Sequence, residues 1–384
     1  MGLRSVLDNH RIVVCIGSGG VGKTTTAAAL ALDAALNGRR VLCLTIDPAR
    51  RLANSLGLTE MTSSEQRVET ALFTRHGLKP QGSLSAMMLD AKRTFDELVI
   101  QYASSAAARD QILNNRLYQY VSASLAGTQE YMAMEKLHAV RQNQEWDLIV
   151  LDTPPTSNAL DFLQAPERLV SAIDSGAMRW FLESFEGAKK TSLGLVGRGT
   201  GALLRGLSRF TGVDFLRQIA EFVTGLNDLF GGFRQRAEEV AKTLRTDEVT
   251  FVLVTSPAPL AVREAIFFEE KLRHAGMRRG GVVINGVHAL LREPNASDEQ
   301  LKGELQRLLH PADSADRALR KMKQSLDDER VRGVADRIQT EWLRAQIGTD
   351  VCYVEVPAFE KDVHDLGALS RVSDYLSGAR VLGA

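Results

Sequence analysis

Cysteine is scarce in this sequence, which limits the metal chemistry available to it. Three cysteines occur among 384 residues, Cys15, Cys43 and Cys352, and no two of them form a C-x-x-C pair. Thiolate pairs at that spacing are common ligands of structural zinc, so we expect no zinc site. Each cysteine lies in or beside an apolar run, which favours reduced thiols inside a core, as in cytosolic proteins.

An excess of charge and a long apolar run are also missing. Lys plus Arg and Asp plus Glu both number 47, so the formal net charge is zero. Proteins that bind nucleic acid through its phosphates usually carry a basic excess, and we therefore expect no nucleic-acid partner. No apolar run is long enough to span a bilayer, and residues 1–11 lack the apolar centre of a signal peptide. We expect a cytoplasmic protein, one that could act at the periphery of a membrane.

What the sequence does contain is a series of short apolar runs that alternate with helical patterns. The first run ends at glycines, and a helix is expected over residues 24–37, with Gly38 closing it in the cap position. The runs are 11–16, 41–46, 85–89, 148–151, 250–254, 281–284 and 352–356. Apolar strands separated by helices are typical of a parallel sheet covered on both faces. We predict one α/β domain over residues 1–384, with a doubly wound, mostly parallel sheet.

Two helical stretches do not fit a minimal α/β unit and are predicted as insertions. Residues 166–245 form a helical subdomain with apolar residues three and four apart: Phe215, Ile219, Phe222, Leu226, Leu229 and Phe233. That stripe could bind an apolar client segment, or it could pack against the body of the domain. Residues 293–349 are predicted to form a charged helical insertion. It could be a solvated helical excursion without a partner, or a surface that binds a partner.

The first predicted turn carries a phosphate-binding pattern. The stretch GSGGVGKT from Gly17 to Thr24 fits GxxxxGK[ST] and lies between a predicted strand and a predicted helix. Its glycines allow backbone N–H groups to point at phosphate oxygens, and the N-terminus of the helix adds positive potential. We therefore expect ATP to bind at Gly17, Ser18, Gly19, Gly20, Val21, Gly22, Lys23, Thr24 and Thr25.

Carboxylates at the ends of two further strands complete the predicted site. Lys23 is expected against the β- and γ-phosphates, and the Thr24 hydroxyl is expected on Mg²⁺, which prefers oxygen ligands. Asp152 ends the run 148–151 and is the second expected Mg²⁺ ligand. Asp47 ends the run 41–46, where a carboxylate can orient the attacking water. The ends of parallel strands are where ligands bind in such sheets, which supports both assignments.

Four stretches resemble one family, the ArsA-like ATPases. This family contains the arsenite-pump ATPases and the ATPases for guided entry of tail-anchored proteins, within the deviant Walker A class. The loop 17–25 is similar to its GKGGVGKTT, and residues 47–52 (DPARRL) resemble its switch I. Residues 152–160 (DTPPTSNAL) resemble its switch II, and residues 356–363 (VPAFEKDV) resemble its adenine loop. Residues 127–134 (GTQEYMAM) are similar to the bacterial branch of the family.

The resemblance implies further site residues and a partner. It implies that Asn285, Pro357 and Phe359 contact adenine, and that the chain works as a homodimer or as a heterodimer with a paralogue. In the tail-anchored-protein branch, the helical insertion holds a hydrophobic membrane-protein client. The same role is therefore expected for residues 166–245.

This chain departs from the family pattern at the second residue of the loop. Ser18 stands where the family has a lysine that reaches the phosphates of the partner subunit, and Arg50 replaces the usual histidine of switch I. Ser157 and Asn158 replace the Gly-His of switch II. A cation supplied by a partner can be worth ~10³–10⁵ in rate. Either the lone chain hydrolyses slowly, or Arg50 or Arg51 substitutes, or a lysine-bearing paralogue pairs with it.

Three functions remain open from the sequence. The first is a dimeric ATPase switch that couples ATP hydrolysis to binding a hydrophobic client. The second is an energising ATPase subunit of an anion or arsenite export system, against which the absence of cysteine from the switch and helical regions argues. The third is a low-turnover nucleotide-binding partner of a lysine-bearing paralogue, which Ser18 favours.

Overall fold

The protein was analysed as a computed structural model. The structure describes residues 2–46, 51–58, 61–116, 118–119, 122, 128–153, 171, 235–292, 295–309 and 314–382. The predicted client stripe at residues 215–233, and almost all of the predicted insertion 166–245, lie outside the described residues. Asp47 and Arg50 lie outside them as well.

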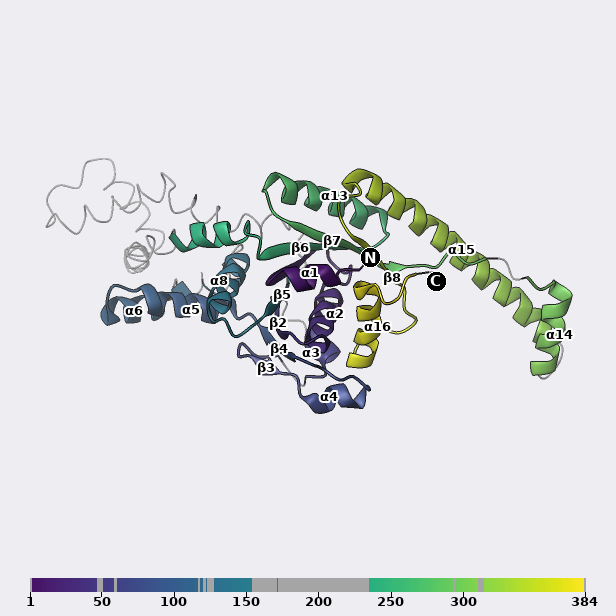
Figure 1. The fold of residues 1–384 in the computed structure, drawn as a ribbon, viewed down its shortest axis with the longest axis horizontal. Coiled ribbons are helices and arrows are strands. Elements are labelled where there is room, and N and C mark those ends of the chain that lie inside the picture. The colour runs from purple at the N-terminus through teal and green to yellow at the C-terminus, as the bar shows by residue number, and fades with distance from the viewer. Residues whose placement is uncertain are drawn as a thin grey trace, which may run out of the picture.

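One sheet of eight strands organises the described part of the chain (Figure 1). Its spatial order is β3-β4-β2-β5-β1-β6-β7-β8, and every pairing is parallel except β3 with β4. The strands are β1 (Ile12–Ile16), β2 (Arg40–Thr45), β3 (Gln66–Arg67), β4 (Ser83–Met88), β5 (Leu148–Asp152), β6 (Val249–Thr255), β7 (Arg279–Val287) and β8 (Tyr353–Pro357). The prediction of a doubly wound, mostly parallel α/β fold is confirmed.

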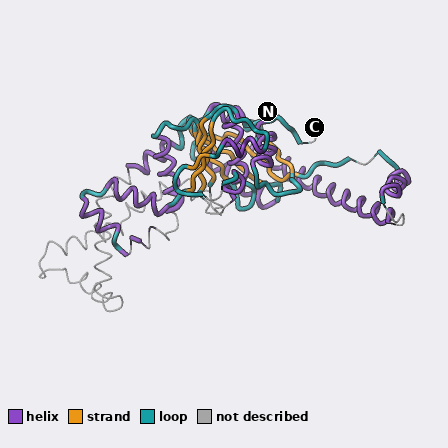
Figure 2. Tube along the Cα trace, turned by 90° about the horizontal axis from the view of Figure 1, so that it is seen from below, coloured by secondary structure: helices purple, strands orange, loops and turns teal. Residues whose placement is uncertain are grey.

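Helices cover both faces of this sheet, as Figure 2 shows from below. One face packs against α1 (Arg4–Asn9), α2 (Lys23–Leu36), α3 (Arg51–Leu56), α4 (Thr70–Arg75) and α16 (Leu366–Ser377). The other packs against α5 (Ala91–Tyr102), α8 (Thr128–Gln142), α13 (Pro259–His274) and the helical residues 235–243. All five residues of β1 and of β5 are buried, because both of their faces contact helices. The central strands therefore fix the positions of the residues that follow their carboxyl ends.

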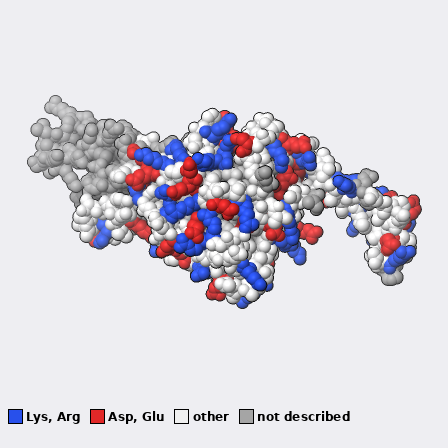
Figure 3. Space-filling view, in the orientation of Figure 1, with Lys and Arg blue, Asp and Glu red and all other residues white. Residues whose placement is uncertain are grey.

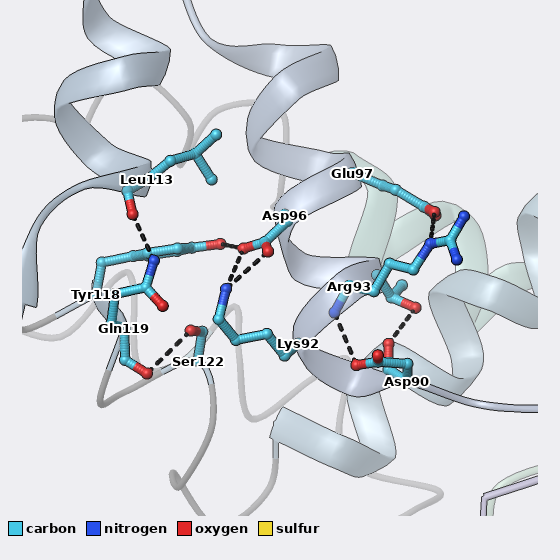
Figure 4. A network of polar contacts seen from close by, with 10 residues as sticks. Asp90, Lys92, Arg93, Asp96, Glu97, Leu113, Tyr118, Gln119 and Ser122 are labelled. Atoms are coloured by element: carbon cyan, nitrogen blue, oxygen red, sulfur yellow. Dashed lines mark hydrogen bonds and ion pairs between the residues drawn. The ribbon is translucent and has the colours of Figure 1, made fainter. Parts of the chain in front are cut away.

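Polar contacts surround α5 on the second face of the sheet (Figure 4). Asp90 caps α5 by accepting a hydrogen bond from the Arg93 amide at 2.9 Å. Asp96 accepts from the Tyr118 hydroxyl at 2.5 Å and pairs with Lys92 at 2.7 Å. Desolvation and the Asp96 carboxylate both raise the pKa of Tyr118, which keeps its hydroxyl a donor. The helix α6 (Ala106–Leu113) follows α5.

A long arm leaves the body beside β7 (Figure 1). It consists of α14 (Asp298–Leu308) and α15 (Ser314–Ile347), which lie within the stretch 293–349 that is predicted as a charged helical insertion. Asp298 and Lys323 pair at 2.7 Å, and Lys302 and Asp316 pair at 2.6 Å, so α14 is fastened to the start of α15. The last turns of α15 pack into the hydrophobic core of the body through Leu343 and Ile347.

The sequence located the strands better than it located the short elements. Each of the seven predicted runs is a strand within a few residues of its predicted ends. The α2 helix ends at Leu36 with Asn37 as its cap, so Gly38, which was predicted as the cap, lies one residue beyond it with φ 95°. The antiparallel edge strand β3 was not predicted, because two polar residues carry no apolar signal. No helix in the described ranges is long and apolar enough to cross a membrane.

Candidate functional site

The centre of the sheet presents a glycine-rich loop to one edge. The strand β1 lies between β5 and β6, and residues 17–22 connect its end to the first turn of α2. A helix N-terminus without a side-chain cap therefore lies at the carboxyl ends of the strands. This is the geometry in which a loop can surround an anion, and it is the geometry that the pattern at Gly17–Thr24 predicts.

Close contacts with neighbouring strands determine the shape of the loop. A side chain at Gly17 would collide with the Val254 carbonyl of β6. A side chain at Gly22 would collide with the amide of Asn285 on β7, and Gly22 has φ 92°, which other residues rarely adopt. The two glycines thus allow the loop to approach the sheet more closely than any larger residue would permit.

Lys23 folds back over this loop. It is the first residue of α2, only 6% exposed, and its Nζ donates a hydrogen bond to the Ser18 carbonyl at 2.8 Å. The ammonium group is therefore held at the same place as the N–H groups of the loop and the positive end of the helix. Positive charge from these three sources converges on one point, which suits a polyphosphate.

Asn285 lies against the loop as well. Its Nδ2 donates to the Val21 carbonyl at 3.0 Å, which joins the end of β7 to the phosphate loop. The sequence resemblance implied an adenine contact for this residue, and that role stays a prediction. The structure adds a second role, because a side-chain donor on β7 fixes the carbonyl of a loop residue 264 positions earlier.

A buried carboxylate lies next to the loop at the ends of β5 and β2. Asp152 is fully buried, and its Oδ2 accepts a hydrogen bond from the Thr45 hydroxyl at 2.9 Å. The next residue, Thr153, donates from its hydroxyl to the Cys15 carbonyl at 2.8 Å. Register places Asp152 opposite Cys15 of β1 and opposite Thr45 of β2. Asp152 is thus held beside the strand that leads into the loop, the position at which a Mg²⁺ ligand was predicted.

The sequence did not single out Thr45 and Thr153 as positioning residues. Both are buried hydroxyls at strand ends, one two residues before Asp47 and the other directly after Asp152. The sequence does contain one signal for this role, a hydroxyl residue next to a carboxylate at the end of a strand. Such a hydroxyl is expected because a buried carboxylate needs hydrogen-bond donors around it. Their role is to orient Asp152 and the end of β1.

The negative charge at Asp152 also affects the nearby thiols. Burial raises the pKa of Cys15 and of Cys43, and the Asp152 carboxylate raises both further. Thiolates are the metal-binding and nucleophilic form of cysteine. These two cysteines are therefore held as neutral thiols and supply no soft ligands to the site.

The remaining predicted residues divide between the loop and the edge of the sheet. Thr24 and Thr25 are half-buried in the first turn of α2, and Ser18 is half-buried in the loop, whereas Gly19 and Gly20 are exposed. Pro357 ends β8 and pairs in register with Val287. The Phe359 ring lies 6.2 Å from Tyr375 and 5.9 Å from the Arg371 guanidinium, both on α16. Any adenine contact would have to be made by the half of this ring that α16 leaves open.

The donor set fits Mg-ATP. Oxygen atoms of Thr24 and Asp152 are the hard ligands that Mg²⁺ prefers, and Lys23 with the loop amides suits the phosphates. A separate cavity of about 480 Å³, to which no loop residue contributes, is lined by the segment from Ser256 to Pro259, Gly286, His288, Ala335, Asp336, Ile338 and Gln339. It lies at the ends of β6 and β7, the edge of the sheet to which the loop belongs.

The contact of Asn285 with Val21 leads to a testable consequence. Asn285→Ala removes a hydrogen bond that fixes the loop, and we expect nucleotide affinity to fall about five- to tenfold. Titration with ATP and with GTP separates the two roles of the residue. If Asn285 acts by holding the loop, both affinities fall together, whereas a loss for ATP alone would contradict the loop-holding role.

Comparison with known proteins identifies the family to which this geometry belongs. Residues 10–336 match the family described as anion-transporting ATPases (ArsA_ATPase). The chain is 24% identical over 382 residues to a Malassezia globosa protein named ATPase GET3, with 97% of this chain and 93% of the relative covered. It is 26% identical to a Neurospora crassa protein of the same name, covering 78% of this chain and 79% of the relative.

A third relative has the same printed name. It is the Schizosaccharomyces pombe ATPase GET3, 27% identical over 293 residues, with 74% of each chain covered. The match extends from before β1 to within α15 and so includes the loop, Asp152 and Asn285. From the convergence of Lys23, the loop amides and Asp152 at one edge, and from these matches, the chain belongs to the anion-transporting ATPase (ArsA-like) family and is an ATPase.

Proposed function

We propose that this protein is a dimeric, Mg-ATP-hydrolysing switch that couples ATP turnover to binding or targeting of a hydrophobic membrane-protein client in the cytoplasm. The observation that carries the proposal is the position of Lys23 Nζ over the loop, 2.8 Å from the Ser18 carbonyl. The buried Asp152 is one strand away from that loop. The ammonium group, the loop and the carboxylate thus lie at the same edge of the sheet.

The residues of the chain divide the work of hydrolysis. Lys23 and the loop amides bind the β- and γ-phosphates and stabilise the charge that develops on them. Thr24 and Asp152 would hold Mg²⁺, which would neutralise charge on the same phosphates. Asp47 orients the water that attacks the γ-phosphate, and the Lys23–Ser18 contact keeps the ammonium group in place before nucleotide binds. Asn285, Pro357 and Phe359 are the proposed adenine contacts.

The client role rests on the family resemblance and on the names of the relatives. The proposal assigns client binding to residues 166–245, whose apolar stripe would form a groove for a membrane helix. The client class is tail-anchored membrane proteins, whose single apolar segment needs protection from water. Such a role would bring a cytoplasmic protein to the membrane surface transiently.

An export role for metalloid is less well supported. Arsenite-like species bind soft thiolate ligands. Burial and the Asp152 carboxylate raise the pKa of Cys15 and Cys43, so these thiols are poor ligands at neutral pH. A low-turnover role beside a lysine-bearing paralogue has more support, because Ser18 cannot supply a positive charge to a partner's phosphates.

Substitution of Asp47 tests the proposed hydrolysis. Asp47→Asn should leave ATP affinity within about threefold of the parent while turnover falls about 100-fold or more, because the water loses its orienting carboxylate. Lys23→Ala is the matched control. It should weaken ATP binding about ten- to 100-fold, since charged hydrogen bonds to phosphate are lost, with an unchanged circular dichroism spectrum. Normal turnover in Asp47→Asn would refute the assigned mechanism.

Restoring the family lysine tests the role of Ser18. In Ser18→Lys, we expect the turnover of the isolated chain to rise at least about tenfold, because a dimer would then carry a cation across to the partner's phosphates. Ser18→Gln is the control for side-chain length without charge. An unchanged rate in Ser18→Lys would mean that an arginine of this chain already supplies the cation, or that the nucleotide sites of the two subunits do not face each other.

A further inference from the structure

The outer face of the α15 arm is exposed along its whole length. Residues at alternating spacings of four and three form one seam on this helix, and each of them is exposed: Arg317, Lys321, Gln324, Asp328, Val331, Ala335, Ile338, Trp342 and Ala345. Such a spacing keeps side chains on one side of a helix over several turns. The apolar members are far from buried, with Val331 70% and Ile338 59% exposed.

The opposite face of α15 holds the arm against the body. Gly333 lies against the Ala289 carbonyl, where a Cβ would come within 2.7 Å. His288 Nδ1 contacts Asp336 at 2.7 Å, and the same carboxylate accepts from the His288 amide at 2.8 Å. The part of the seam from Arg317 to Val331 therefore lies away from these contacts, whereas Ala335 and Ile338 line the cavity at the ends of β6 and β7. The helix α15 extends from the body towards α14 (Figure 1).

On this outer face, basic residues precede Gln324 along the helix and acidic residues follow it. Arg320 and Lys321 lie four and three residues before Gln324, and Asp327 and Asp328 lie three and four residues after it. None of these four charged side chains has a hydrogen bond or an ion pair with any residue in the described ranges. Their neighbours do, since Arg332 pairs with Glu329 at 3.0 Å and Arg337 with Glu341 at 2.8 Å.

This arrangement is complementary to itself. In an antiparallel pair of α15 helices with a two-fold axis at Gln324, Lys321 of one copy lies on the same flank as Asp328 of the other, and Arg320 lies on the same flank as Asp327. The symmetry repeats both pairs, so four opposite-charge contacts form. A parallel pairing would bring like charges together, and a uniformly charged partner such as nucleic acid would be repelled by one of the two halves. Arg317 would lay its aliphatic stem on Val331 of the other copy.

We propose that the arm is a dimerisation surface, and that its partner is the α15 arm of a second copy of this chain, antiparallel and centred on Gln324. The interface requires neither nucleotide nor client, so it goes beyond the proposed function and does not depend on it. Because the contacts are exposed ion pairs, the pairing is weak and salt-sensitive. Figure 3 shows that positive and negative side chains are otherwise interspersed over the visible face of the body.

A cysteine placed on the two-fold axis tests this geometry. In Gln324→Cys, the two new thiols face each other across the axis, and mild oxidation of the nucleotide-free full chain at low salt should give a cross-linked dimer. Ser325→Cys is the matched control, since residue 325 is exposed but lies about 100° round the helix. The unsubstituted chain sets the background from Cys15, Cys43 and Cys352. Equal cross-linking of Gln324→Cys and Ser325→Cys, or none in Gln324→Cys, would overturn the proposal.

Charge reversal in the same Gln324→Cys chain gives an independent test. Arg320→Glu with Lys321→Glu makes an all-acidic arm, and Asp327→Lys with Asp328→Lys makes an all-basic arm. Each variant alone should lose at least about 90% of the cross-linked product, and a 1:1 mixture of the two should recover it as a heterodimer. All four sites are on the surface, so both variants should retain the circular dichroism spectrum of the parent. A mixture that cross-links no better than the separate variants would overturn the arm pairing, and the ATPase proposal would be unaffected.

Discussion

The contact between the glycine loop and the ends of β6 and β7 is the constraint on which the rest of the site depends. At Gly17 and Gly22 the backbone approaches the Val254 carbonyl and the Asn285 amide more closely than any side chain would allow. The loop is therefore shaped by strands that follow it by more than 200 residues. The Lys23 ammonium is already held against the Ser18 carbonyl of the same loop, so little conformational entropy remains to be lost when a phosphate binds. Preorganisation of this kind is also what stabilises developing charge during hydrolysis.

Burial of charge at this edge is the second constraint. Asp152 is fully buried, which is costly for a carboxylate unless donors surround it, and the Thr45 hydroxyl supplies one of them. The same charge helps to raise the pKa of the two central thiols. The centre of the sheet thus provides hard oxygen ligands, whereas its two thiols stay protonated and are poor soft ligands. A phosphate-bound magnesium ion matches that chemistry better than a metalloid does.

The sequence predicted the parts of this structure that rest on local patterns. Seven strands follow from apolar runs, and the loop follows from glycine spacing before a helix, because each pattern reflects a constraint within a few residues. Contacts between distant segments were not predictable in this way. The Asn285–Val21 bond, the Thr45–Asp152 bond and the packing of Gly333 against residue 289 all depend on how strands and helices assemble. The basic and acidic residues of α15 could be read as a binding surface only after the structure showed that one face of this helix is exposed from end to end.

The central claim is that the loop from Gly17 to Thr25 binds adenine nucleotide together with magnesium, and calorimetric titration of the purified chain tests it most directly. The account predicts one ATP site per chain and an affinity that falls when magnesium is removed by chelation, since Thr24 and Asp152 act through the metal. It also predicts that pyrophosphate competes with ATP, because the loop grips the phosphates. Absence of heat and of competition at millimolar Mg-ATP, with the protein folded, would contradict the account.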